Sequence, residues 1–198
     1  MNLDFSVIQN QKNLLAFSAG VDSSALFFLL LEQNIPFDIA IVNYNLRVQS
    51  KDEVFYAKNL ASKYKKNIFL KETKIENISN FEKNARDIRY KFFDEIILEN
   101  SYENLITAHQ LNDKLEWFMM QLSKGAGLVE LIGFNEFEQK ENHKIYKPLL
   151  NITKEELENY LKINNHKYFV DQSNFDEKYK RNYFRHTFSN KFLENFSS

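Results

Sequence analysis

The chain has 198 residues, 43% hydrophobic and 15% aromatic, with a formal net charge of -1 and no cysteine. Its length allows one large or two small globular units, and apolar residues spread along the whole chain, with only 2 prolines and 4 glycines, exclude collagen-like and broadly disordered proteins. The absence of cysteine excludes disulfides, thiolate metal sites, iron–sulfur clusters and thiol nucleophiles within these residues.

The first residues of the chain predict no secretory signal. Residues 1–10 have no basic residue before a hydrophobic block, which is unlike a secretory signal peptide. No apolar run approaches the roughly 18 residues that span a bilayer. We therefore expect a soluble, cytoplasmic protein with no membrane partner.

Strand and helix patterns then alternate along the first two thirds of the chain. Short apolar runs and helical spacing of apolar residues predict a strand over 14–17, a helix over 22–32, a strand over 37–42, a helix over 52–64, a strand over 67–70, a helix over 80–98, a strand over 105–108 and a helix over 112–123. This order predicts an α/β fold: a parallel sheet with helices on both faces and ligands beyond the carboxyl ends of the strands.

The pattern changes after Gly133, where a polar stretch precedes a short strand-like piece near Tyr146. We place a soft boundary here, with a first domain over residues 1–135 and a C-terminal extension over residues 136–198. Thr153 and Glu156 form a capping box that opens a helix to about residue 164, and a last helical segment is expected over 181–195.

The segment between the first strand and the first helix has the composition of a phosphate-binding loop. Backbone N–H groups and the positive end of a helix hold polyanions at such a place, and serine hydroxyls add donors. It is neither a Walker A loop nor a dinucleotide fingerprint. The alternative is that Asp22 or Ser23 serves only as the N-cap of the helix and that the loop binds no phosphate. The residues concerned are Ser18, Ala19, Gly20, Val21, Asp22, Ser23 and Ser24.

Two carboxylates lie three residues apart on the helix over 112–123. Asp113 and Glu116 share one face, opposite an apolar stripe that includes Leu115 and Phe118. Such a pair suits Mg²⁺ on ATP phosphates or the ammonium group of an amine substrate. On spacing alone, a solvated face at a helix start is the simpler interpretation. His109, just before the helix, is by itself more typical of a structural residue.

The loop closely resembles the Ser-Gly-Gly-x-Asp-Ser motif of N-type ATP pyrophosphatases, which cleave ATP between its α and β phosphates. The resemblance implies a Rossmann-like fold and ATP as cofactor, with Mg²⁺ near Asp22 or Asp113. Ala19 stands where that family has glycine. If this position needs a positive φ, alanine costs about 1 kcal/mol there.

Within that superfamily the chain resembles the tRNA(Ile)-lysidine synthetases over roughly residues 13 to 195. It keeps Ala108, His109, Asp113 and Glu116 of their Ala-His-His-x-Asp-Asp-x-x-Glu-Thr motif. Family-like segments also occur in the right order at 82–90, 124–128, 147–150, 171–176 and 181–186. It departs from the family pattern at Ala19, Asn43, Gln110, Asn112 and Trp117.

The resemblance implies that ATP adenylates the wobble cytidine of a tRNA(Ile) with a CAU anticodon, and that free L-lysine then displaces AMP. Asp22, Asp113 and Glu116 would be catalytic. Arg86, Arg89, Arg181 and Arg185 would contact RNA or substrate, although Arg86 and Arg89 also fit a salt-bridged helix face and Arg181 and Arg185 a basic helix end.

Two alternatives stay open at this point. Related tRNA thiolases and amidating synthetases share this ATP site, but the former rely on cysteine and the latter need an ammonia source. A non-catalytic RNA-binding remnant would explain the departures from the family pattern. The sequence also leaves open whether the chain forms a homodimer.

Overall fold

A computed structural model of the chain describes residues 3–46, 49–74, 81–170, 184–189, 192–193 and 195. The strands are β1 (Asn13–Ala16), β2 (Asp38–Asn43), β3 (Ile68–Glu72), β4 (Asn104–Ile106), β5 (Phe137–Gln139) and β6 (Lys144–Tyr146). The helices are the 3-10 turn η1 (Ser6–Ile8), α1 (Val21–Glu32), α2 (Gln49–Lys63), α3 (Phe81–Asn100), α4 (Leu111–Leu122), α5 (Leu128–Leu131), α6 (Lys154–Ile163) and the π-helix η3 (Arg185–Ser189).

The strands form one six-stranded sheet in the order β3-β2-β1-β4-β6-β5. All neighbouring pairs are parallel except β5 with β6. The order in which the strands follow one another along the chain reverses between β1 and β4. In an open α/β sheet, ligands bind at such a point, beyond the carboxyl ends of the strands. The predicted α/β class with a mostly parallel sheet is confirmed.

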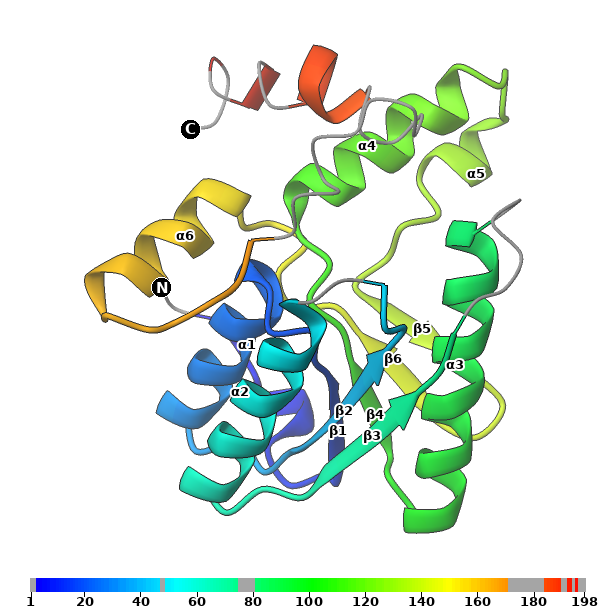
Figure 1. The fold of residues 1–198 in the computed structure, drawn as a ribbon. Helices are drawn as coiled ribbons and strands as arrows, with labels where there is room; N and C mark the ends of the chain where they lie inside the picture. Colours follow the sequence, from blue (N-terminus) through cyan, green and yellow to red (C-terminus); the bar gives the residue numbers. More distant parts are fainter. Residues whose placement is uncertain are drawn as a thin grey trace.

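Helices cover both faces of the sheet, which divides the core in two (Figure 1). On one face α1, α2 and α6 enclose a cluster that includes Phe27, Leu60 and Leu157. On the other face α3 packs Phe93 and Ile97 against the sheet. The continuous apolar runs of β1 and β2 follow from this arrangement, because these strands are buried on both faces.

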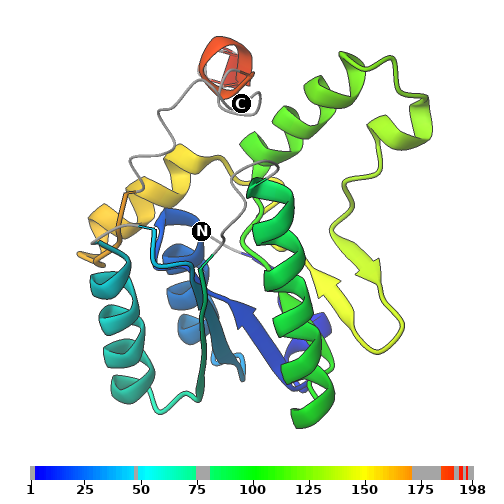
Figure 2. The same cartoon turned by 45° about the vertical axis from the view of Figure 1, so that its right-hand side comes forward.

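Helices α4 and α5 rise from the carboxyl edge of the sheet as a projecting arm, which the turned view separates from α3 (Figures 1 and 2). The π-helix η3 lies against α4. This edge therefore gathers residues from both ends of the chain.

The first eight predicted strands and helices all appear within a few residues of their expected positions, as does the helix capped by Thr153. The prediction missed η1, α5 and β5. Of the expected last helix, the described residues include η3 and helical positions at 192–193 and 195. The boundary at 135–136 stays a prediction; β5 and β6, which follow it, extend the same sheet.

Within the described residues, no helix is long and apolar enough to cross a membrane.

Candidate functional site

The loop between β1 and α1 has the backbone of a phosphate cradle. Ala19 is fully buried and adopts φ 62°, so this position does require the left-handed conformation. Alanine is strained in this conformation, whereas glycine would not be. Gly20 then caps α1 in an extended conformation. The next N–H groups lack partners within the helix, because the first turn of any helix leaves them unpaired.

Serine side chains and a distant strand segment hold the loop in this shape. Ser18 N–H donates to Ser23 Oγ at 3.2 Å, and the two hydroxyl oxygens lie 3.0 Å apart. Phe169 N–H donates to the carbonyl of Ala19 at 2.9 Å, and Phe169 forms a parallel bridge with Gly20. The segment that follows α6 thus extends beside the loop and fixes its strained peptide.

Asp22, in the first turn of α1, has a strongly raised pKa. Burial, and then the negative charge of Asp113, raise the pKa of Asp22 to about 7; Lys154 and Arg185 oppose this shift. Its Oδ1 atom is buried, and no described residue gives it a hydrogen bond. A buried oxygen of this kind, beside a second carboxylate and next to a phosphate cradle, fits a divalent cation.

The start of α4 brings Asp113 to the same place. Gln110 caps the helix: its side chain accepts from Asn112 N–H at 2.5 Å, and Asp113 Oδ2 accepts from Gln110 N–H at 3.2 Å. Gln110 and Asn112, which depart from the family motif, therefore build this helix end. Asn112 Oδ1 also accepts from the backbone N–H of Lys154 at 3.1 Å, which joins α4 to the start of α6.

Glu116 is fully buried and bound by Arg185. The guanidinium donates to both carboxylate oxygens, at 2.6 Å from Nε and 3.1 Å from Nη2, and Nη2 also lies 3.9 Å from Asp113 Oδ1. This bidentate pair fastens η3 to α4 and holds the guanidinium beside Asp113.

The polar face of α4 is more deeply buried than its apolar stripe. Its buried residues are Asn112, Asp113 and Glu116, whereas Phe118 and Leu122 of the apolar stripe are 38% and 51% exposed. The interpretation of Asp113 and Glu116 as a solvated helix face is therefore wrong.

Arg86 and Arg89 lie on an exposed face near the start of α3. The Arg86 guanidinium packs over the Tyr90 ring at 5.1 Å. Arg89 interacts with the Tyr44 hydroxyl, where its charge opposes the burial that raises the pKa of Tyr44. Neither arginine is among the residues that meet around Asp22. Arg181 lies outside the described residues.

The other departures from the family motifs have structural partners. Asn43 Oδ1 accepts from Asn45 N–H at 2.8 Å, and Asn45, with φ 53°, turns the chain after β2. Trp117 Nε1 donates to the carbonyl of Glu130 at 3.3 Å, which ties α4 to α5. His109, which the chain shares with the family motif, has its Nδ1 atom 2.9 Å from the Thr107 hydroxyl. These residues shape the surroundings of the site.

Sequence reasoning missed Lys154, the first residue of α6, as part of this site. Its backbone contacts α4, and its charge lowers the pKa of Asp22. The Thr153 cap predicted that a helix begins at this point of the sequence. It did not predict that this helix start would lie beside Asp22 in the fold. Across the described part of the chain, no group of three or more acidic or histidine side chains could hold a metal ion. A cation here would thus need ligands besides the protein, as Mg²⁺ on ATP phosphates has.

Comparisons with known proteins agree with this geometry. The family model of the PP-loop domain matches residues 3–192. The chain is 51% identical over 192 residues to the tRNA(Ile)-lysidine synthase of Campylobacter jejuni (strain RM1221), covering 96% of this chain and 59% of that protein. It is 50% identical over 199 residues to the same enzyme of Helicobacter hepaticus, covering 98% of this chain and 47% of that protein. The chain thus spans about half the length of these relatives.

Among solved structures, the fold resembles the U34-tRNA thiolase NcsA from Methanococcus maripaludis with its [4Fe-4S] cluster, with a TM-score of 0.71. The alignment covers 98% of this chain and 76% of that chain at 20% identity. At this identity the likeness concerns the fold.

Proposed function

The chain belongs to the PP-loop domain family, which binds ATP, and from this premise we propose that it ligates lysine to the wobble cytidine of a tRNA(Ile) with a CAU anticodon. The observation that carries the proposal is the identity of about 50%, over nearly the whole chain, to proteins named tRNA(Ile)-lysidine synthase. The aligned region includes every residue of the candidate site.

In the proposed reaction, the cytidine O2 attacks the α-phosphorus of ATP and pyrophosphate leaves with the bridging oxygen. The ε-amine of lysine then attacks C2, the C2–O bond breaks, and AMP leaves as the amine loses its proton. The products are lysidine, AMP and pyrophosphate.

The loop from Ser18 to Ser23 would bind the phosphates. Its serine hydroxyls and the N–H groups at the start of α1 are donors for phosphate oxygens. Mg²⁺, when bound, would offset negative charge on the leaving pyrophosphate, and Asp22 and Asp113 are the residues to hold it. The buried, unbonded Oδ1 of Asp22 supports this assignment.

Asp113 is also the carboxylate proposed to orient the lysine ammonium, because it lies beside the loop. Glu116 would act differently, since both its oxygens already accept from Arg185. We assign Glu116 as the positioning residue of Arg185, whose guanidinium would contact a phosphate or the lysine carboxylate. Arg86, Arg89 and Arg181 would contact the RNA.

A lysine-incorporation assay tests the function. Purified protein with Mg·ATP, labelled lysine and a tRNA(Ile) transcript is expected to incorporate label and to release AMP. A transcript with uridine at the wobble position is the control and should stay unlabelled. Asp113→Asn should lose at least 100-fold in rate and remain folded. Folded wild-type protein that does not label authentic cognate tRNA would refute the proposal.

A further inference from the structure

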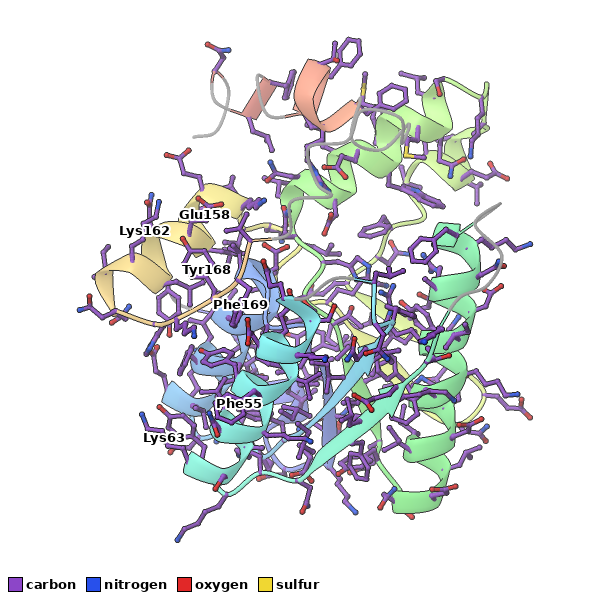
Figure 3. All side chains as sticks on the ribbon, viewed as in Figure 1. Phe55, Lys63, Glu158, Lys162, Tyr168 and Phe169 are labelled. Atoms are coloured by element: carbon purple, nitrogen blue, oxygen red, sulfur yellow. The ribbon has the colours of Figure 1, made fainter. Side chains whose placement is uncertain are left out.

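A solvent-facing surface runs from the ATP loop along α2. It consists of one face of α2 together with the segment 167–170 that follows α6 (Figure 3). Figure 3 shows Phe55 of α2 and Tyr168 and Phe169 of that segment on the same side of the molecule. We call it the α2 surface; its residues are Lys51, Phe55, Tyr56, Lys58, Lys63, Lys167 and Phe169.

The α2 surface is continuous with the nucleotide site at its upper end. Phe169 N–H donates to Ala19 of the phosphate loop. Gln49 Nε2, in the first turn of α2, donates to the carbonyl of Val170 at 3.3 Å. A ligand that leaves the site on this side would therefore meet α2 first.

Phe55 is the most unusual residue of this surface. Its ring is 67% exposed in the middle of a helix. Lys51 and Lys58 lie one turn before and one turn after it on the same face, and both are exposed. The two lysines are about 10 Å apart along the helix axis, given its rise per residue. An open ring between two ammonium groups combines a stacking platform with two phosphate contacts.

The other two lysines of the α2 surface pair with aromatic rings. The Lys167 ammonium lies 5.6 Å from the Tyr56 ring centre and 4.8 Å from that of Phe169, and Lys63 lies 5.1 Å from the Tyr64 ring. Tyr56 Oη donates to the carbonyl of Lys167, which fixes the segment on α2.

The acids nearby do not cancel these charges. Asp52 and Glu53 lie on α2, and Glu53 accepts from Gln49 Nε2 at 2.9 Å. On α6, Glu158 pairs with Lys162 at 3.8 Å. Lys51, Phe55, Lys58 and Ser62 follow one another along the helix and are all exposed. The exposed Asp52 lies one turn before Phe55 and Tyr56, and the four lysines of the α2 surface outnumber it. Local charge complementarity therefore favours a polyanion with unpaired bases.

We propose that the α2 surface binds a single-stranded part of the substrate RNA, with an unpaired base stacked on Phe55 and adjoining phosphates on Lys51 and Lys58. The inference rests on the proposed function in that the ligand is an RNA. It assigns a second RNA contact, on α2, apart from the arginines of α3 and the C-terminal end.

Binding of fluorescently labelled tRNA(Ile) transcript, measured by anisotropy, tests the α2 surface. Phe55→Ala should weaken binding about 5- to 150-fold, the range for loss of one stacked base, and Phe55→Trp should restore it. Lys51→Glu with Lys58→Glu should weaken binding and flatten its salt dependence. Leu98→Ala, 59% exposed on α3, and Lys144→Glu, exposed at the amino end of β6, are matched controls that should bind as wild type.

The outcomes separate this inference from the proposed function. If Phe55→Ala and the double lysine variant bind RNA as tightly as wild type, or if the wild type binds no RNA, the α2 surface is refuted. If the wild type fails to incorporate lysine but the variants still lose RNA affinity and the controls do not, the surface stands and the lysidine reaction falls. Unchanged Mg·ATP affinity in all variants is expected, because none contacts the loop through its side chain.

Discussion

At the scale of single residues, Asp22 makes the site sensitive to pH. Its pKa is raised from 3.8 to about 7, so between these values the folded protein keeps a proton that the unfolded chain has lost. Stability from this group is therefore highest at low pH and is lost as pH rises towards 7. Above pH 7 the folded protein holds a buried, unbonded charge unless a cation neutralises it.

Asp22→Asn should consequently stabilise the protein at pH 8 without divalent ions, by an amount on the order of 2 kcal/mol, and much less at pH 4.5. Urea unfolding with a chelator at both pH values measures this difference. The same variant should lose Mg·ATP-dependent activity. The wild-type kcat/KM for Mg·ATP should fall below about pH 7, because a proton on Asp22 of the unliganded protein competes with the cation. An equal gain in stability at both pH values would contradict the assignment.

Ala19 is a second residue whose backbone can be tested. A β-branched side chain is poorly tolerated at φ 62°, so Ala19→Val should cost about 2 kcal/mol or more in the free energy of unfolding. Ala19→Gly removes the backbone strain, but it also removes a buried methyl group and raises the conformational entropy of the unfolded chain. Because these effects oppose one another, the free energy of unfolding should stay within about 1 kcal/mol of wild type. Chemical denaturation distinguishes the two, and a valine variant as stable as wild type would show that the loop rearranges.

Sequence reasoning identified most of the residues of the site but not their surroundings. Asp22 and Asp113, which the sequence offered as alternative Mg²⁺ ligands, interact electrostatically, because both open helices at the carboxyl edge of one sheet. The burial of Glu116 could not be predicted, since helical periodicity reports an apolar stripe and not which stripe faces the protein. Its partner Arg185 is 69 residues away, a distance that no local pattern bridges.

At the scale of elements, the bidentate ion pair of Arg185 with Glu116 joins η3 to α4. Arg185→Gln removes the charge that Arg185 places against the buried Glu116, and Glu116→Gln removes the bidentate acceptor of the guanidinium. Each change should weaken docking of η3 by about 2–3 kcal/mol, and the double variant should lose little more than the worse single one. Hydrogen exchange should rise in residues 184–189 in these variants while β1 stays protected. Additive losses would contradict a direct pair.

The alternation of strands and helices was predictable because each element up to residue 123 satisfies its own periodicity. The elements that were missed are short or polar. Helix α5 has four residues, and β5 has three exposed residues that join the sheet only by pairing with β6. The structure of such segments depends on contacts with neighbouring elements, and their own sequences contain no periodic pattern that predicts it.

At the scale of the whole molecule, ligand binding should stabilise the fold through the loop that joins β1 to α1. Mg·ATP at about 100 times its dissociation constant should raise the melting temperature by about 5–10 °C. Ser23→Ala removes a buried hydroxyl that bonds Ser18 and should abolish most of this shift, with a smaller change in the unliganded protein.

Ser6→Ala, an exposed serine of η1, is the matched control and should keep the full shift, which differential scanning calorimetry measures. A Ser23→Ala protein with an undiminished shift would mean that the nucleotide binds elsewhere.

The hydrogen bond from Phe169 to Ala19 can form only late in synthesis of the protein. The ribosome completes the strand and helix around the loop early, but the residue that secures the loop emerges about 150 residues later. Until then Phe169 is not available to bond the carbonyl of Ala19. We expect ribosome-bound chains that stop before Phe169 to retain ATP poorly. Translation would thereby delay nucleotide binding until the segment beside the loop has been made.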